Sequence, residues 1–187
     1  MSHRGVQHSL VAGQSLPTHL CWFVKDGYLR VTGWADQVEM FGLGIWGPGE
    51  IVMPVLFARY PVELRALSSA RVQECDPDHI EQHGCLTAHM NQMVMLLQLT
   101  RIRPAEVRLF HLLIWLCERF GSITEQGYAL PLEKMNLTHR QLAEMASVSR
   151  VTVTKSLGYF RQQGWLERVD DVDMLSKTGI GLFSGFR

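Results

Sequence analysis

Residues 137–163 read LTHRQLAEMASVSRVTVTKSLGYFRQQ, in which Thr138 and Ser149 each stand directly ahead of a short amphipathic segment. Threonine and serine are favoured at the N-cap of a helix, and Gln141, three positions after Thr138, completes a capping box. A short polar turn separates the two segments, and a glycine follows the second. Two short helices joined in this way predict a helix-turn-helix.

The second predicted helix, Arg150 to Gln163, has an inward and an outward face. Val153, Leu157 and Phe160 recur at helical spacing and are expected to be buried. The opposite face is therefore exposed, and the N-terminal end of a recognition helix is the part that enters the major groove of DNA. The side chains predicted to contact bases there are Arg150, Val151, Thr154 and Lys155.

Each predicted DNA contact has a chemical reason. Arg150 can pair with O6 and N7 of guanine through two hydrogen bonds, and an exposed Val151 suits contact with a thymine methyl group. Hydroxyl groups and backbone N–H groups near helix N-termini suit phosphate oxygens. The predicted phosphate contacts are Thr138, Arg140, Ser149 and Thr152. The alternative interpretation is a helical hairpin on which Arg150 and Lys155 are ordinary solvated side chains.

The charge of the chain is informative locally rather than globally. The formal net charge of the 187 residues is zero, so it gives no sign of nucleic-acid binding. Between Thr138 and Arg168, however, there are five lysine and arginine residues against two glutamates. This excess of positive charge falls on the segment that would have to approach phosphates.

The composition limits the class of protein. Apolar residues make up 47% and charged residues 19% of the chain, which is typical of a globular protein. No apolar run approaches the roughly 18 residues of a membrane span. Residues 1–20 contain no apolar signal segment, so we expect a cytoplasmic protein without a membrane partner. The four cysteines are scattered without a C-x-x-C pair, and reduced, buried thiols are expected.

Residues 10–75 predict a β domain. They contain short runs of β-branched and aromatic residues at 20–24, 28–32 and 38–45. Turn signals separate these runs at Asp26-Gly27, Ala35-Asp36 and Gly47-Pro48-Gly49. Short strands at regular spacing predict a sandwich or barrel that closes on itself.

The pattern becomes helical after residue 77, with a short turn expected from His79 to His83 and a longer helix over residues 86–102. One apolar face of the longer helix has the spacing of a coiled-coil seam. The seam residues, predicted to form a dimer interface, are Leu86, Met90, Met93 and Leu97. The second face, expected to pack on the β domain, is formed by Met95, Leu96, Leu99 and Ile102. The alternative is an ordinary core helix inside a monomer.

A proline marks the junction after the long helix. Pro104 lacks a backbone N–H, so it is expected to end that helix or to begin the next one, Ala105 to Phe120. Gly121 is expected to follow the last turn of this helix as its C′ residue. The joint formed by residues 101–104 is therefore a predicted domain boundary and hinge.

One group of cysteine and histidine residues could bind a metal. It consists of Cys75, His79, His83, Cys85 and His89. On one helix face these side chains could ligate zinc or haem. Asp76-Pro77, however, resembles a helix start, which leaves Cys75 in a strand and makes the histidines partly exposed helix residues. We therefore expect no metal and no cofactor.

These motifs together resemble the Crp/Fnr family of regulators, and the likeness covers nearly the whole chain. The residues that match the DNA-binding signature of that family are 137–143 and 149–155. The stretch 109–121 looks like the helix that precedes the signature. Gly13-Gln14 and residues 24–27 and 47–50 look like turns of the effector domain of the family.

The resemblance implies a homodimer through the long helix, with each recognition helix bound to half of a palindromic operator. The run from Arg150 to Thr154 is especially similar to the branch that contains the cyanobacterial global nitrogen regulator, which implies half-sites that begin GTA. Cyclic-AMP receptors carry Glu where Val151 stands, so their TGTGA-type half-site is not expected. The implied partners are double-stranded DNA and a second copy, with RNA polymerase as a further candidate.

The effector domain departs from the cyclic-nucleotide branch. That branch holds the cyclic phosphate with an Arg-Ser pair downstream of a Gly-Glu pair. Counted without gaps from Gly49-Glu50, these positions hold Tyr60 and Pro61. Neither side chain can replace a guanidinium–phosphate pair, so we expect a regulator that does not depend on cyclic nucleotides.

The expected fold is α+β. Residues 1–85 are expected to form an N-terminal β jelly roll like a cyclic-nucleotide-binding domain, 86–103 a dimerisation helix and hinge, and 104–187 a winged helix-turn-helix, with its wing around Asp170-Asp171. We expect a transcription regulator rather than an enzyme. One alternative is a dimeric interaction protein with a vestigial helix-turn-helix. Another is a cupin-like metalloenzyme, but its His-x-His set is missing, since residues 10–74 contain only His19.

Overall fold

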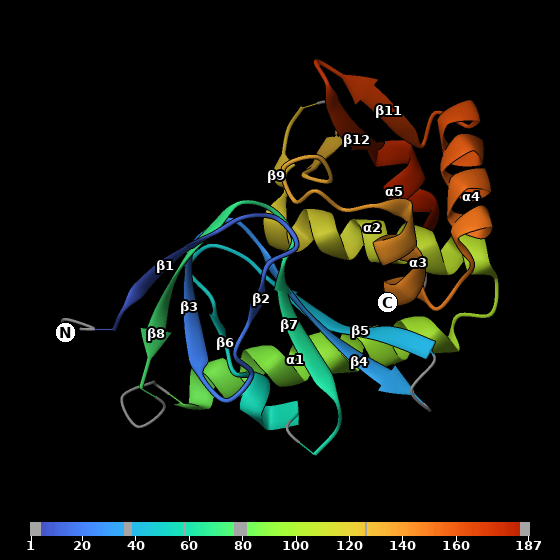
Figure 1. Ribbon diagram of the computed structural model, residues 1–187. Helices are drawn as coiled ribbons and strands as arrows, with labels where there is room; N and C mark the ends of the chain where they lie inside the picture. Colours follow the sequence, from blue (N-terminus) through green and yellow to red (C-terminus); the bar gives the residue numbers. More distant parts are fainter. Residues whose placement is uncertain (1–4, 36–38, 58, 77–81, 126, 184–187) are drawn as a thin grey trace. The chain divides into compact units, whose positions relative to one another are not determined.

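The computed structural model describes residues 5–35, 39–57, 59–76, 82–125 and 127–183 (Figure 1). The chain forms two compact units, residues 1–96 and 97–187, and the boundary between them falls within helix α1 (Gln82–Arg101). Most of the short helical turn predicted from His79 to His83 lies outside the described residues, as does Asp36. None of the helices in the described ranges combines the length and apolar character needed to cross a lipid bilayer.

The N-terminal unit contains two four-stranded antiparallel sheets. One sheet has the order β1 (Gln7–Leu10), β8 (Ala70–Cys75), β3 (Cys21–Asp26) and β6 (Ile51–Val52). The other has the order β2 (Ser15–Leu16), β7 (Val62–Ala66), β4 (Leu29–Ala35) and β5 (Glu39–Trp46). A short 3-10 helix, η1 (Pro54–Phe57), lies between β6 and β7 in the sequence. The predicted β domain is confirmed.

Apolar side chains from both sheets form one buried cluster. Trp22 and Val24 enter it from β3, and Leu29 and Val31 enter it from β4 of the other sheet. These residues are two positions apart because successive side chains of a strand point to opposite faces of the sheet. The alternating pattern of the sequence therefore places the core between the two sheets.

Two of the predicted turns depend on glycine. Gly27 has a φ of 78°, and an added Cβ would lie 2.3 Å from the carbonyl oxygen of Ser69. Gly49 has a φ of 87° and precedes Glu50, whose backbone N–H donates to the carbonyl of Gly47. Positive φ angles are accessible to glycine without steric cost. The turns predicted at 26–27 and 47–49 are confirmed.

Helix α1 has two unlike faces. Leu96 and Leu99 of the face predicted to pack inward are buried, Met95 is half-buried, and Ile102 follows the last residue of the helix. The predicted seam residues Leu86, Met90, Met93 and Leu97 are all exposed. The helix is therefore apolar on two sides, and the side that carries the predicted seam is exposed to solvent in the single chain.

Two buried polar residues of α1 bond to backbone N–H groups at the end of β5 and directly after β6. The Gln92 side-chain oxygen accepts a hydrogen bond from the N–H of Ile45 at 2.9 Å. His89 Nε2 accepts from the N–H of Met53 at 3.2 Å, and its Nδ1 donates to the carbonyl of Cys85 at 2.8 Å. His89 is only 2% exposed, so the expectation of a partly exposed residue is wrong. The ring can be buried because both of its nitrogens have backbone partners.

The C-terminal unit is a winged helix-turn-helix. Its helices are α2 (Ala105–Phe120), α3 (His139–Ala146), α4 (Arg150–Gln162) and α5 (Lys177–Phe183). Its sheet has the order β11 (Leu166–Val169), β12 (Val172–Ser176), β10 (Gly127–Leu130) and β9 (Ser122–Ile123). Asp170 and Asp171 join β11 to β12 with φ angles of 48° and 63°. Such a two-residue hairpin turn favours aspartate, asparagine and glycine, and the predicted wing is confirmed.

The predicted bounds of α2 are confirmed, but the role of the glycine after it differs from the prediction. Pro104 is the N-cap of α2 and Gly121 is its C-cap. Gly121 has a φ of −88° and is not left-handed as a C′ glycine usually is. Instead, a Cβ at this position would lie 2.2 Å from the carbonyl oxygen of Ala129. Glycine is needed here for close approach to β10.

An aromatic cluster forms part of the core of this unit and includes a helix that was not predicted. The ring of Phe110 in α2 lies 4.4 Å from that of Phe183 in α5 and 5.0 Å from that of Phe160 in α4, measured between centroids. Glycine is a weak helix former, and α5 contains Gly179. A Cβ on Gly179 would lie 2.8 Å from the Cβ of Trp165. Close packing therefore explains this helix better than local propensity does.

Candidate nucleic-acid interface

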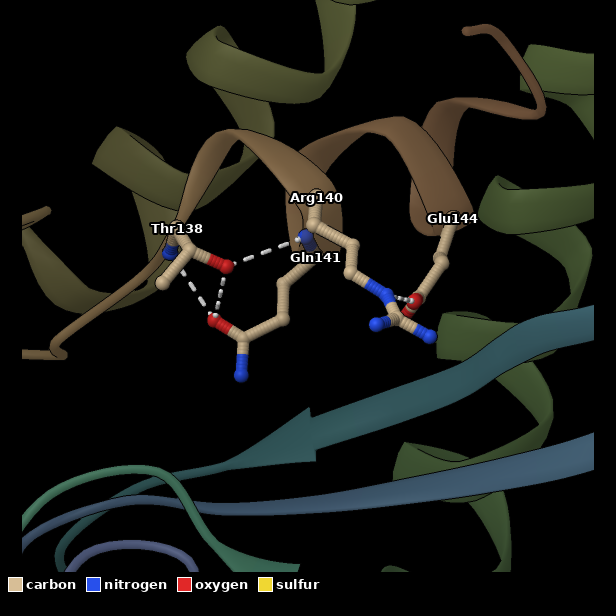
Figure 2. Close-up of polar contacts among 4 residues, drawn as sticks. All are labelled: Thr138, Arg140, Gln141 and Glu144. Carbon is tan, nitrogen blue, oxygen red and sulfur yellow. Dashed lines mark hydrogen bonds and ion pairs between the residues drawn. The ribbon is translucent and has the colours of Figure 1, made fainter. Parts of the chain in front are cut away.

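The predicted capping box positions the start of α3. The N–H of Gln141 donates to Oγ1 of Thr138 at 3.3 Å, and the N–H of Thr138 donates back to the Gln141 side chain at 2.8 Å (Figure 2). The Thr138 hydroxyl also lies 3.0 Å from the same Gln141 oxygen. The hydroxyl predicted to contact phosphate therefore already has a structural role at the N-cap.

The turn between α3 and α4 contains a residue in a strained conformation and is stabilised by an arginine that is distant in the sequence. Ser147 adopts the left-handed conformation, with φ 50° and ψ 51°. Arg108 of α2 donates from Nη1 to the carbonyls of Ala146 and Ser147, at 3.1 and 2.9 Å. Its Nε also donates to the carbonyl of Ile102 at 2.9 Å. Arg108 thus fixes the turn that presents α4, a role that the sequence pattern did not indicate.

Ser149 caps α4 as predicted. Its Oγ accepts from the N–H of Thr152 at 3.0 Å and lies 2.8 Å from the Thr152 hydroxyl. The two hydroxyls predicted to contact phosphate therefore bond to each other at the start of the helix. Both lie where the unpaired N–H groups of a helix N-terminus favour an anion.

The two faces of α4 are as predicted. Val153, Leu157 and Phe160 are buried, with exposed fractions of 2% or less. The four residues predicted to contact bases are all exposed, namely Arg150, Val151, Thr154 and Lys155. The Val151 side chain is 62% exposed, so an apolar group stands in solvent between polar neighbours. The first turns of the helix therefore present two cations and one aliphatic group together.

Ion pairs reduce the positive charge that the sequence count indicated. Arg140 Nε donates to Glu144 at 3.0 Å (Figure 2), and Arg161 Nη2 lies 3.5 Å from Asp173. Arg168 lies 3.2 Å from Glu133 and 3.5 Å from Asp171. Neither Arg150 nor Lys155 forms an ion pair within the described part of the chain. Of the five cations counted between Thr138 and Arg168, the two without an ion pair in the described residues are therefore both in the first turns of α4.

A histidine from α3 contacts the outward face of α4. His139 Nδ1 lies 2.9 Å from Oγ1 of Thr154. The same Oγ1 lies 3.1 Å from the carbonyl oxygen of Arg150, one turn earlier. Thr154 is therefore held by both helices of the helix-turn-helix, and the sequence pattern did not indicate this contact.

Tyr60 and Pro61, which occupy the positions where the cyclic-nucleotide branch has its phosphate-binding pair, lie in an exposed connection of the N-terminal unit. Tyr60 is 71% exposed and Pro61 is also exposed, in the segment that leads to β7. Glu50 accepts a hydrogen bond from the N–H of Gly47 at 2.7 Å, so its side chain stabilises the turn that precedes it.

Three cysteines gather at one end of the N-terminal unit. Cys21 and Cys75 lie opposite each other on β3 and β8, which confirms the strand position of Cys75. Cys85 of α1 packs against the same cluster. Burial raises the pKa of the Cys21 thiol to about 11 and also raises the pKa of Cys75 and Cys85. Among the described residues, no three His, Cys, Asp or Glu side chains are arranged so that they could hold one metal ion, and the side chains of His79 and His83 lie outside those residues.

Residues 107–177 match the model of the Crp-like helix-turn-helix domain. A wider match links the chain to the regulatory protein CysR of Synechococcus elongatus. The two sequences are 35% identical over 167 residues, which cover 87% of this chain and 81% of CysR.

Solved structures share the fold along nearly the whole chain. A CooA mutant from Carboxydothermus hydrogenoformans matches with a TM-score of 0.75 and 21% identity, over 97% of this chain and 87% of that one. TTHB099, a transcriptional regulator of the CRP family from Thermus thermophilus, matches with a TM-score of 0.73 and 15% identity, over 95% and 96% of the two chains. At these identities the similarity concerns the fold.

Proposed function

This chain belongs to the Crp/Fnr family of transcription regulators, and we propose that it binds a palindromic DNA site as a homodimer without requiring a cyclic nucleotide. Its C-terminal unit is the helix-turn-helix DNA-binding domain, and its relatives are regulators rather than enzymes. One observation carries the proposal. The start of α4 exposes Arg150 and Lys155, which form no ion pair within the described residues, beside the exposed aliphatic Val151.

The proposed base contacts follow from the chemistry of that surface. Arg150 donates two hydrogen bonds to O6 and N7 of guanine, and Val151 contacts a thymine methyl group. Lys155, one turn further along α4, and Thr154 contact neighbouring base edges. A good bidentate contact contributes about 1–3 kcal/mol of discrimination between bases.

The proposed phosphate contacts come from the N-termini of α3 and α4. Thr138 and Ser149 order these termini through their caps, so their backbone surroundings favour phosphate oxygens. Thr152 and Arg140 complete the set. Because Arg140 is already paired with Glu144, we expect it to contribute less to the salt dependence of binding than an unpaired arginine would.

The exposed seam of α1 supports the proposed homodimer. Met90 and Leu97 are each 59% exposed, and Leu86 and Met93 are 39% and 38% exposed. Large apolar side chains repeated along one helix face favour a second helix as their cover. We propose residues 86–103 as the dimerisation helix and hinge, between an effector-like domain at 1–85 and a DNA-binding domain at 104–187.

A charge placed on this seam tests the dimer. Met90→Glu is expected to shift the sedimenting species from dimer to monomer, because two carboxylates would be buried in one interface. Gln98→Glu is the matched control, since Gln98 is exposed on the same helix but outside the seam. Equal dissociation of both variants, or a wild-type chain that sediments as a monomer, would contradict the proposed interface.

Independence of cyclic nucleotides is supported by the residues at the expected clamp. Tyr60 and Pro61 offer no guanidinium and hydroxyl pair to a cyclic phosphate. Titration with cyclic AMP and cyclic di-GMP is therefore expected to leave the affinity for DNA unchanged, and a tightening by either nucleotide would contradict it. Contact with RNA polymerase is a further proposal, supported by the role of the family in transcription.

Selection of binding sites from random DNA tests the proposed function as a whole. The expected product is one palindromic motif whose half-sites are one helical turn or a multiple apart, as two recognition helices of a dimer require. Enrichment of no motif would favour an interaction protein with a vestigial helix-turn-helix. A single unrepeated half-site would contradict the proposed dimer.

A further inference from the structure

The hydroxyl group of Thr154 has two partners inside the protein. Oγ1 lies 3.1 Å from the carbonyl oxygen of Arg150 and 2.9 Å from Nδ1 of His139. A threonine hydroxyl has one hydrogen to donate and two lone pairs. When that hydrogen goes to the Arg150 carbonyl, His139 Nδ1 must carry a proton and donate to Oγ1. When it goes to His139, Nδ1 is the acceptor.

Both arrangements leave Thr154 without a hydrogen for DNA. In either case Oγ1 keeps lone-pair capacity, so towards a ligand this side chain offers an acceptor and a methyl group. In the major groove guanine presents two acceptors, N7 and O6, and no donor. Adenine and cytosine present amino groups, and thymine presents a methyl group. An acceptor-only side chain is therefore compatible with three bases and mismatched with guanine.

From this geometry, and on the basis of the DNA-binding function proposed above, we infer that His139 sets the base specificity of Thr154. His139 is a positioning residue that keeps the Thr154 hydroxyl turned towards the protein. Thr154 consequently selects against guanine at one position of each half-site.

The contact with His139 is what fixes the orientation of the Thr154 hydroxyl. A threonine within a helix populates two χ1 rotamers, because its hydroxyl can bond to the carbonyl three or four residues back. That local bond alone is weak and competes with other partners. His139 belongs to α3, so its contact ties the Thr154 rotamer to the packing of the two helices. Thr154 is exposed, and a side chain there without such a tie could rotate and donate to guanine.

The experiment compares base preferences rather than affinities alone. Sites are selected from random DNA with the wild-type chain, and Thr154→Ala identifies the position that Thr154 faces. At that position His139→Ala is expected to raise binding of the guanine-containing site roughly fivefold relative to the preferred site, the value of one ordinary hydrogen bond. His139→Asn, whose amide can occupy the place of Nδ1, is expected to retain the wild-type preference.

Repeating the His139 substitution in a variant that lacks the Thr154 hydroxyl distinguishes the inferred effect from a general effect on folding. Thr154→Val has the shape of threonine and no hydroxyl, so His139→Ala in that background is expected to leave the guanine preference unchanged. Three results would overturn the inference: an unchanged profile in His139→Ala, an equal loss of affinity for all four bases, or the same change in the Thr154→Val background. A wild-type chain that enriches no motif would instead overturn the proposed function, and the inference with it.

Discussion

Polar side chains serve opposite purposes in the two units of this chain. In the N-terminal unit His89 and Gln92 are buried and accept hydrogen bonds from the backbone N–H groups of Met53, directly after β6, and Ile45, in β5. In the C-terminal unit Arg150 and Lys155 are exposed on α4 and form no ion pair within the described residues. A buried polar group whose bonds are all made within the fold stabilises that fold. An exposed cation without an internal partner is available to an anion.

The two candidate sites also differ in the side chains that they expose. The start of α4 combines exposed cations with an exposed aliphatic side chain, Val151, and this combination fits the edge of a base pair. The connection at Tyr60 and Pro61 exposes an aromatic ring and a proline where a phosphate clamp would need a guanidinium and a hydroxyl. The exposed surface of α4 is therefore suited to a ligand that the connection at Tyr60 and Pro61 does not fit.

The largest expected effect is on DNA binding. Arg150→Ala should weaken binding to the selected palindrome by about 2–6 kcal/mol, because both half-sites lose a bidentate contact. Binding to unrelated DNA should fall much less, and the free energy of unfolding should stay within about 0.5 kcal/mol of the wild type. Binding titrations on both DNAs and urea unfolding measure this. An equal loss on both DNAs would mean that Arg150 contacts only phosphate.

Replacing a buried polar side chain is expected to lower the free energy of unfolding, which Arg150→Ala leaves almost unchanged. Gln92→Leu leaves the buried N–H of Ile45 without its acceptor and should destabilise the N-terminal unit by about 1–3 kcal/mol in urea unfolding. Gln98→Leu on the exposed side of the same helix is the matched control and should change stability little. If both variants unfolded at the same urea concentration, the bond to Ile45 would contribute nothing measurable.

A smaller effect is expected at the strained turn before α4. Ser147→Gly should stabilise the C-terminal unit by about 0.5–1 kcal/mol, because glycine adopts the left-handed conformation without steric cost. The matched variant is Gly164→Ala, where φ is 66°, and it should destabilise by about 1 kcal/mol. Thermal unfolding measures both shifts, and a lower melting temperature for Ser147→Gly would contradict the assignment of strain.

The smallest expected effect concerns the thiols. At pH 8 a disulfide reagent should modify the half-exposed Cys85 before Cys21 and Cys75, which are buried. Cys85→Ser should remove the fast phase, and its persistence would contradict the burial pattern.

Burial raises the pKa of Cys21 from 9.0 to about 11, so its ionisation favours the unfolded state. The contribution of the neutral Cys21 thiol to the free energy of unfolding is thus fully present below pH 9 and falls as the pH rises towards 11.

The sequence predicted best what local interactions determine. The caps Thr138 and Ser149 lie at the predicted positions because an N-cap bonds to residues two or three positions ahead. Arg108 could not be predicted, since its partners Ala146 and Ser147 lie 38 and 39 residues away. A long-range contact between a side chain and a backbone carbonyl leaves no periodic signal in the sequence.

Other features escaped prediction because packing, not pattern, determines them. His89 interrupts the apolar periodicity of α1 and was expected to be partly exposed, yet backbone groups of Met53 and Cys85 satisfy its ring. Helix α5 has weak helical propensity and is held by contacts of Phe183 with Phe110. The contact between His139 and Thr154 depends on the packing of α3 on α4, which residue spacing alone does not fix.

The direct contact of Arg150 with guanine is most sharply tested by a double-mutant cycle with modified DNA. Replacing the guanine of each half-site with 7-deazaguanine removes the N7 acceptor and leaves the base pair intact. This change should weaken binding of the wild-type chain by roughly fivefold per half-site, about the value of one hydrogen bond. Binding of Arg150→Ala should not respond to the modification. An equal loss for both proteins would contradict the assignment of Arg150 as the guanine-reading residue.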